Sequence, residues 1–258
     1  GELRAQQSRR ERWRPAPGGV SLGHFRVTAG TLGAVVRDRA TGDRLILSNN
    51  HVLANTNDAA ENDPILQPGA ADGGRAETDI VARLERFCPI DFSIQPGTCE
   101  LANAYAVAGN LLARALGSSH RVTAYQAHPQ AVNLVDAAVA RPVNDGDILD
   151  EILEIGVVMG AAPAVLGMSV RKSGRTTGLT TGTITVLHAT VDVSYRGGRT
   201  ARFEDQIVTS PMSQGGDSGS LLVRGDALLA VGLLFAGSDQ STIHSPIEAV
   251  LDCLEVTL

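Results

Sequence analysis

Aromatic residues are scarce in this chain. Phe, Trp and Tyr together make up 3% of its 258 residues, whereas hydrophobic residues as a whole reach 43%. A sizeable core is therefore expected to consist mostly of Val, Leu, Ile and Ala. No apolar run approaches the roughly 18 residues of a membrane-spanning helix, and no signal-peptide pattern opens the sequence. Residue 1 is a glycine, so removal of an upstream piece stays an open alternative.

A basic excess is also lacking, and the chain is only mildly acidic. The 22 Lys and Arg residues stand against 28 Asp and Glu, a formal net charge of −6. Nucleic-acid and membrane-surface proteins usually carry a basic excess or patch, so we expect neither partner. The Gly-rich stretch 174–182 has no Lys-Ser/Thr at the position that a phosphate-binding loop requires. No metal and no organic cofactor is expected.

Cysteine is rare, with only Cys88, Cys99 and Cys253. Their spacing does not suit a metal site, and three cysteines cannot all pair within one chain. Because disulfides persist mainly in oxidising compartments, we expect buried free thiols and a cytoplasmic location. A disulfide between Cys88 and Cys99 is the alternative.

Glycines crowd one serine near the C-terminal end. Residues 213–220 read Ser-Gln-Gly-Gly-Asp-Ser-Gly-Ser and lead directly into the apolar run 221–223. Glycine is favoured where a side chain would forbid the backbone conformation. We therefore interpret Ser218 as a nucleophile, with the backbone N–H groups of Gly216 and Ser218 as oxyanion donors. Taken alone, the same composition suits an ordinary turn that enters a strand.

Two upstream residues favour the catalytic interpretation. His51 follows a strand-like apolar pattern, and Asp136 lies in a nearly all-apolar stretch, where a buried carboxylate needs a partner. Asp79, which precedes an alternating strand pattern, is the alternative to Asp136. The chain order His, Asp, Ser excludes an α/β-hydrolase, in which Asp and His follow the serine.

At these residues the sequence resembles the chymotrypsin-like (trypsin-like) serine proteases. It is more similar to bacterial and plant intracellular members, including the NARROW LEAF-like group, than to secreted digestive enzymes. The resemblance rests on Gly-Asp-Ser-Gly at 216–219 with His51 and Asp136 upstream, although His51 lacks the usual neighbouring cysteine. It implies an all-β fold of two antiparallel six-stranded barrels. It also implies a serine endopeptidase that works through a Ser-His-Asp triad and an acyl-enzyme intermediate.

The domain organisation is expected to follow that fold. Residues 1–18, with five arginines and two glutamates, form a basic N-terminal arm. This arm is either a mobile tail or a short helix that docks on the acidic body or on a neighbouring subunit. The protease domain 19–258 is expected to have its first barrel at about 19–150 and its second at about 151–258. A helical insertion at about 98–117, with apolar residues at helical spacing, is expected to pack on the first barrel or on another subunit. An ordinary core helix is the alternative interpretation of the same pattern.

The end of the chain predicts a terminal helix. Ser245, Pro246 and Glu248 would occupy the N-cap, N1 and N3 positions of a capping box. A final helix is also what the family resemblance implies.

The resemblance further implies where a substrate lies. The base of the specificity pocket is six positions before the nucleophile, at Met212, and an apolar base offers no counter-charge to Lys or Arg. The expected substrate-binding residues are Met212, Ser213, Phe235, Ala236, Gly237 and His244. We expect small or medium apolar side chains to be preferred, with Glu or Gln, recognised by His244, as the second choice. A packed structural histidine is the plainer interpretation of His244.

Activation is expected to differ from that of the digestive enzymes. They place a newly cut α-amino group beside the aspartate that precedes the nucleophile, here Asp217, but this chain has no suitable apolar start. Asp217 therefore needs another partner, or the loop is ordered by assembly or ligand. A protein or peptide substrate and a homo-oligomer are the expected partners. An oligomeric scaffold or binding module with little or no proteolysis stays the alternative function.

Overall fold

The computed structural model describes residues 7–258. The expectations for residues 1–6, the first third of the basic arm, lie outside the described residues. The chain forms two compact units, each of which is described by itself. The first contains the chain up to residue 90 together with 134–189 and 205–258, and the second contains 91–133 and 190–204.

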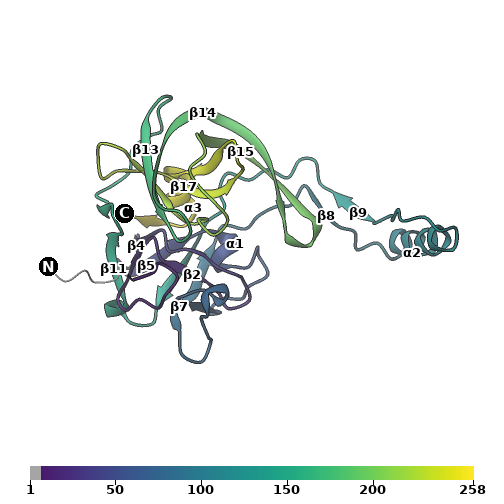
Figure 1. Cartoon of the computed structure of the whole chain (residues 1–258), viewed down its shortest axis with the longest axis horizontal. Helices are drawn as coiled ribbons and strands as arrows, with labels where there is room; N and C mark the ends of the chain where they lie inside the picture. The colour runs from purple at the N-terminus through teal and green to yellow at the C-terminus, as the bar shows by residue number, and fades with distance from the viewer. Residues whose placement is uncertain (1–6) are drawn as a thin grey trace. The chain divides into compact units, whose positions relative to one another are not determined.

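The first unit contains a curled antiparallel sheet with the strand order β19-β4-β5-β10-β7-β6-β2-β3 (Figure 1). Its strands are β2 (Ser21–His24), β3 (Gly30–Thr31), β4 (Ala34–Asp38), β5 (Arg44–Ser48), β6 (Pro64–Leu66), β7 (Ile80–Phe87), β10 (Ala138–Pro142) and β19 (Val256–Thr257). Alternating side chains of these strands enter a core that is almost entirely aliphatic. The scarcity of aromatic residues had predicted such a core.

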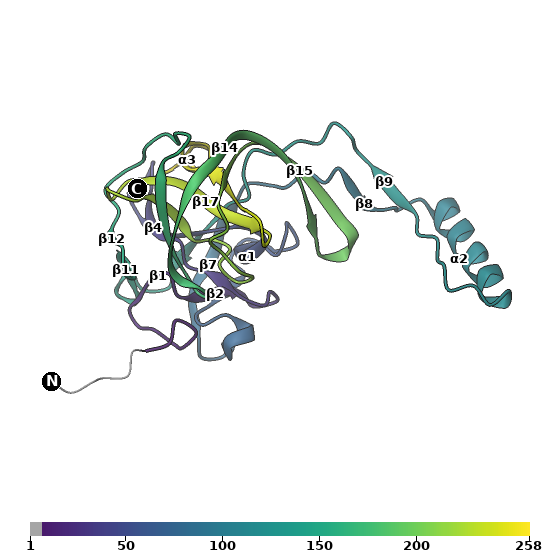
Figure 2. The ribbon, with the colours of Figure 1, turned by 45° about the horizontal axis from the view of Figure 1, so that its top comes forward.

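A second antiparallel sheet in the same unit has the order β14-β13-β16-β17-β18-β15. Its strands are β13 (Ser169–Gly174), β14 (Gly178–Tyr195), β15 (Arg199–Thr209), β16 (Leu221–Arg224), β17 (Ala230–Gly237) and β18 (Thr242–Pro246). In the part of the chain described, β14 also pairs with β15, which closes these six strands into a ring (Figure 2). The all-β class with two antiparallel barrels is thus confirmed, with the two-residue strands β3 and β19 added to the first.

Short elements complete the first unit. The strands β1 (Ala16–Gly18), β11 (Ile148–Ile152) and β12 (Gly156–Val157) form a small sheet in which β1 runs parallel to β11. The remaining helices of this unit are α1 (Asn50–Leu53), η1 (Ala70–Asp72), η2 (Asp145–Asp147) and α3 (Ile247–Cys253). The small sheet fixes the end of the basic arm against the segment that joins the two barrels.

The second unit carries the expected helix. Strands β8 (Ile94–Pro96) and β9 (Tyr125–Ala127) pair antiparallel and flank α2 (Glu100–Ala115), and η3 (Arg196–Gly198) separates the ends of β14 and β15. The apolar side chains of α2, including Leu101 and Tyr105, are exposed. Packing of this helix on another subunit stays a prediction. No helix within residues 7–258 is long and apolar enough to cross a membrane.

The terminal helix exists, but the expected capping box is wrong. Helix α3 begins at Ile247 with Pro246 at the N-cap and no side-chain cap. Ser245 is unavailable because its backbone pairs with Leu233 in the sheet and its hydroxyl accepts a hydrogen bond from the Asp136 N–H at 3.4 Å. Pairing across the sheet therefore overrides the local capping pattern.

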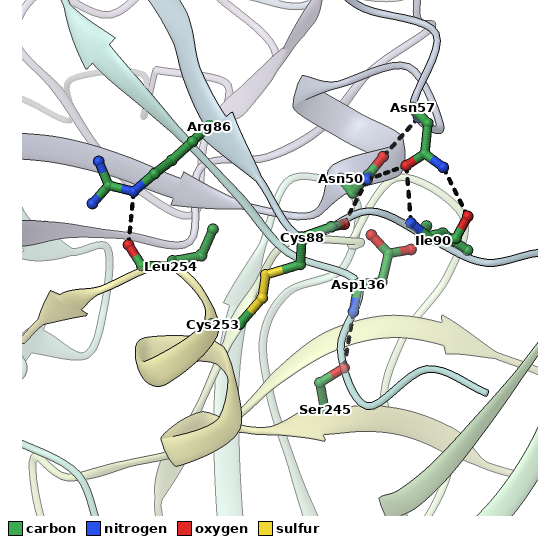
Figure 3. Close-up of a disulfide and its surroundings, with 9 residues drawn as sticks. All are labelled: Asn50, Asn57, Arg86, Cys88, Ile90, Asp136, Ser245, Cys253 and Leu254. Atoms are coloured by element: carbon green, nitrogen blue, oxygen red, sulfur yellow. Dashed lines mark hydrogen bonds between the residues drawn. A yellow bond between two sulfur atoms is a disulfide. The ribbon is translucent and has the colours of Figure 1, made fainter. Parts of the chain in front are cut away.

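The sequence expectation of buried free thiols is wrong, because two of the three cysteines are paired and the third is free but exposed. Cys88 and Cys253 form a disulfide with Cα atoms 6.3 Å apart, and Cys99 is free and exposed (Figure 3). The disulfide joins the segment after β7 to the last turn of α3, across a sequence separation of 165 residues. Only the fold brings these two segments together, so the pairing leaves no trace in the local spacing.

We predict that Cys253→Ser lowers the free energy of unfolding by about 2–5 kcal/mol, as loss of a native disulfide that closes a long loop usually does. Urea denaturation followed by circular dichroism measures the change. Cys99→Ser is the matched control and should unfold as the wild type does, because its side chain is exposed and unpaired. Equal effects of the two substitutions would contradict the prediction.

Candidate active site

The loop that carries His51 is held by a pair of asparagine amides. Asn50 Nδ2 donates to Asn57 Oδ1 at 2.7 Å and to the Cys88 carbonyl at 2.8 Å, while the Asn57 N–H donates back to Asn50 Oδ1 at 3.1 Å. Asn57 also bonds both the N–H and the carbonyl of Ile90 (Figure 3). These hydrogen bonds therefore hold the short helix α1, which contains His51, against residues 88–90 beside the disulfide.

His51 is paired with a buried carboxylate. Its Nδ1 lies 2.7 Å from Asp136 Oδ2, and its backbone N–H donates to Asp136 Oδ1 at 3.2 Å. Asp136 is fully buried, and its carbonyl accepts a hydrogen bond from Asn49 Nδ2. A carboxylate can only accept here, so the proton belongs on Nδ1 and leaves Nε2 as the basic nitrogen.

Asp79 lies elsewhere. Its carboxylate contacts Arg12 of the basic arm at 3.2 Å and accepts hydrogen bonds from the Arg75 N–H and the Thr78 hydroxyl. The structure thus places Asp136, and not Asp79, beside His51.

The glycines around Ser218 form two successive turns. The Asp217 N–H donates to the Gln214 carbonyl, and the Ser220 N–H donates to the Asp217 carbonyl, each at 3.0 Å. The third residue of each turn, Gly216 or Gly219, has a φ of +98° or +94°. A positive φ at this position is the mark of a type II turn and favours glycine.

These turns lie directly against the strand that leads to His51. The Thr31 N–H donates to the Ser218 carbonyl at 2.8 Å, and the Thr31 carbonyl accepts from the Ser48 hydroxyl at 2.8 Å. A Cβ atom on Gly219 would lie 2.1 Å from Ser48 Oγ, so only glycine permits this approach. The serine turn and the end of β5, three residues before His51, are therefore brought together.

The same turns leave two donors available. Within residues 7–258, the backbone N–H groups of Gly216 and Ser218 make no hydrogen bond to a protein acceptor. Unpaired backbone N–H groups beside a nucleophile are what an oxyanion site requires.

A cavity of about 360 Å³ opens beside Ser218. It is lined by Ser213, Gln214, Gly215, Ser218, Leu234, Ala236, Gly237, Ser238 and Asp239. Ser213, Ala236 and Gly237 were expected there, whereas Phe235, Met212 and His244 do not line it. Met212 packs in the core of the second barrel instead.

His244 is wholly buried behind this region. Its Nε2 lies 3.0 Å from the Thr209 hydroxyl, and its Nδ1 has no partner within the described chain. Burial lowers the pKa of His244 to about 3, with a smaller contribution from the charge of Lys172, so the imidazole is neutral at neutral pH. No group of three or more His, Cys, Asp or Glu side chains suitable for a metal ion occurs in residues 7–258.

The comparisons with known proteins agree with this architecture. No protein-family model matches the chain. It is 33% identical over 108 residues to glutamyl endopeptidase 2 of Streptomyces griseus, a match that covers 39% of this chain and 53% of that protein. Serine protease 1 of Streptomyces fradiae is 31% identical over 104 residues, which cover 39% of this chain and 28% of that protein.

Solved structures extend the likeness over most of the chain. A Nocardiopsis protease matches with a TM-score of 0.58 and 19% identity over 94% of this chain and 99% of that one. The chain has the two-barrel fold of the chymotrypsin-like serine proteases. A glutamic-acid-specific serine protease that uses a histidine triad in substrate binding matches with a TM-score of 0.56 and 21% identity over 94% of this chain and 100% of that one. At these identities the structures show the shared fold.

Two narrower expectations, the cytoplasmic location and the subgroup of relatives, are not confirmed. The cytoplasmic location is wrong, because the Streptomyces and Nocardiopsis relatives are secreted, extracellular proteases. The argument from an odd cysteine count failed because the third cysteine does not prevent the other two from pairing. The narrower resemblance to NARROW LEAF-like members stays a prediction that these relatives do not confirm.

The negative charge of Asp217 is neutralised by a buried lysine. Lys172 Nζ lies 3.3 Å from Asp217 Oδ2, and both side chains are fully buried. The Asp217 carboxylate accepts further hydrogen bonds from the Thr177 hydroxyl and from the backbone N–H groups of Thr176, Thr177 and Gln214. We call residues 172–178 the Asp217 cradle. A buried lysine thus stands where the digestive enzymes place their α-amino group.

The charges of this pair influence each other. Burial lowers the pKa of Lys172, although the negative charge of Asp217 opposes the change. Burial raises the pKa of Asp217, but Lys172, Thr177 and the backbone N–H groups outweigh it, so the pKa lies below its usual value. Sequence reasoning recognised that Asp217 needs a partner but missed Lys172, whose only signal is a lysine inside an otherwise strand-like pattern.

We predict that Lys172→Met destabilises the chain by about 3–5 kcal/mol, because it leaves an uncompensated buried carboxylate. The double variant Lys172→Met/Asp217→Asn removes both charges and should recover much of that loss. Chemical denaturation of the two variants at neutral pH measures the difference. If the double variant is as unstable as the single one, the ion pair does not carry the stability assigned to it.

Proposed function

We propose that the chain is a serine endopeptidase with His51, Asp136 and Ser218 as its catalytic triad. The observation that carries this proposal is the 2.7 Å contact between His51 and the buried Asp136. Ser218, for its part, lines a cavity. The relatives in sequence and fold are serine proteases, which supports the activity. No observation favours the alternative of an inactive scaffold.

The reaction follows from the roles of these groups. Ser218 Oγ attacks the carbonyl carbon of the scissile peptide bond while His51 Nε2 takes the hydroxyl proton. Asp136 keeps Nδ1 protonated and stabilises the imidazolium that forms. The N–H groups of Gly216 and Ser218 bind the oxyanion. His51 then gives its proton to the leaving amine, and water hydrolyses the ester on Ser218.

We further propose that the cavity beside Ser218 binds a small or medium apolar side chain of the substrate. Leu234 and Ala236 supply an apolar wall, and the glycines keep the opening clear. The one acidic residue that lines the cavity, Asp239, is exposed to solvent, so its charge is screened. A buried counter-charge for Lys or Arg, which such a side chain would require, is therefore absent from this lining.

Recognition of Glu or Gln is the second candidate. It is favoured by the unpartnered Nδ1 of His244 and by the relationship to a glutamyl endopeptidase. Against it, His244 is neutral and does not line the cavity.

We predict that Ser218→Ala abolishes both peptide hydrolysis and labelling by a fluorophosphonate probe, while the melting temperature stays nearly unchanged. Asp136→Asn should lower turnover by on the order of 10⁴, because the wrong imidazole tautomer is then favoured. Asp79→Asn is the matched control and should retain most of the activity. Labelling of the Ser218→Ala variant would show that another residue is the nucleophile.

We also predict that a fluorogenic peptide library, with each residue fixed in turn before the cleaved bond, shows strongest cleavage after Leu, Val, Met or Ala. The apolar lining of the cavity is the reason. A preference for Glu or Gln that disappears in His244→Ala would replace this assignment with the second candidate. A strong preference for Lys or Arg would exclude both.

A further inference from the structure

The described part of the basic arm, residues 7–18, lies against the rest of the first unit. The Arg9 carbonyl accepts a hydrogen bond from the Ser21 N–H at 2.8 Å, and the Trp13 N–H donates to Gln67 Oε1 at 2.8 Å. The Arg14 guanidinium bonds the same Gln67 side chain at 2.7 Å. Residues 7–18 of the arm are therefore neither the mobile tail nor the short helix that its composition suggested, but an irregular segment that ends in β1 and is held by hydrogen bonds.

One arm residue reaches the Asp217 cradle. Arg9 Nη1 donates to Ser173 Oγ at 2.6 Å and to the Gly19 carbonyl at 3.2 Å, and Arg9 Nη2 pairs with Glu154. The Arg9 side chain is 16% exposed. A Cβ atom on Gly19 would come within 2.7 Å of both Arg9 Nη1 and Ser173 Oγ, so the contact depends on a glycine at this position.

Ser173 follows the lysine that neutralises Asp217. Its neighbour Gly174 packs so tightly that a Cβ atom there would lie 2.5 Å from Asp217 Oδ1 and 2.7 Å from Ser220 Oγ. Lys172 Nζ also donates to the Gly178 carbonyl at the far end of the cradle. A shift of the backbone at Ser173 would therefore move groups that hold both Asp217 and the turn after Ser218.

We propose that Arg9 is a positioning residue, which braces the Asp217 cradle through Ser173 and thereby holds the turn that contains the oxyanion donors. The basic arm thus controls the active site through a side chain, rather than through a free α-amino group. This inference rests on the proposed protease function. Arg9 itself touches neither substrate nor reacting atoms.

The brace works through hydrogen-bond geometry and not through charge. The positive charge of Arg9 adds to the effect of burial in lowering the pKa of Lys172, so on electrostatic grounds alone it opposes the Lys172–Asp217 pair. What Arg9 supplies is a planar fork that bonds Ser173 and Gly19 with one nitrogen and Glu154 with the other. Loss of the fork leaves the buried Ser173 hydroxyl without its donor, which is costly.

The test compares Arg9→Ala with Arg12→Ala in the full chain. Arg12 lies on the same arm, but its guanidinium is half exposed and pairs with Asp79 away from the cradle. We expect Arg9→Ala to lower kcat roughly 10- to 100-fold, less than deletion of an oxyanion donor would, with little change in KM. Arg9→Lys should recover part of kcat, and Arg12→Ala should keep the wild-type value. Concentrations are set by active-site titration, so that unfolded protein does not count as lost turnover.

A double-variant cycle with Ser173→Ala locates the effect. If Arg9 acts through Ser173, the losses in kcat from Arg9→Ala and Ser173→Ala are not additive. Additive losses, or an Arg9→Ala variant with wild-type kcat, would overturn the proposal.

A measurement without catalysis separates this inference from the protease assignment. In a Ser218→Ala background, Arg9→Ala should speed amide hydrogen exchange of residues 172–178 and 213–219, and Arg12→Ala should not. Unchanged exchange in both segments would overturn the role of Arg9, whether or not the chain hydrolyses peptides. Failure of the wild type to react with a fluorophosphonate probe would overturn the protease assignment instead and leave the exchange result standing.

Discussion

The buried ion pair between Lys172 and Asp217 is the interaction on which the candidate active site depends. Two opposite charges without access to water are stable only when each is paired and hydrogen-bonded. Asp217 meets this requirement by accepting hydrogen bonds from Lys172, from Thr177 and from three backbone N–H groups. Because Asp217 directly precedes Ser218, these bonds also fix the turn that presents the serine and its neighbouring N–H groups.

The histidine side of the site has a different support. His51 is held by Asp136, and the loop around it is held by the paired amides of Asn50 and Asn57 (Figure 3). The Cys88 carbonyl accepts one of these amide hydrogen bonds, and the same residue is joined to α3 by the disulfide. A carboxylate, neutral amide hydrogen bonds and a covalent link thus position His51, whereas a buried ion pair positions the turn that contains Ser218. The two sides meet where the Thr31 N–H binds the Ser218 carbonyl.

The chemistry of the cavity follows from small residues. Its lining is mostly Ser, Gly and Ala, with Leu234 as the largest apolar side chain. The larger candidates, Met212 and Phe235, are buried. His244 is buried as well, and burial keeps its imidazole neutral. Backbone close to the opening, rather than bulky or charged side chains, therefore shapes the space beside Ser218.

The sequence by itself determined the all-β class, the aliphatic core, and the local features that set Ser218 and Asp136 apart. Each of these can be recognised in a few consecutive residues: an alternating strand pattern, a cluster of glycines around a serine, or a carboxylate inside an apolar run. The tertiary structure alone decided that Lys172 neutralises Asp217, that Cys253 pairs with Cys88, and that the basic arm docks. The ion pair joins residues 45 positions apart, the contact of Arg9 with Ser173 spans 164 positions and the disulfide spans 165, so local patterns cannot pair these residues. Packing decides such contacts, because residues far apart in the chain become neighbours only through the arrangement of the strands that carry them.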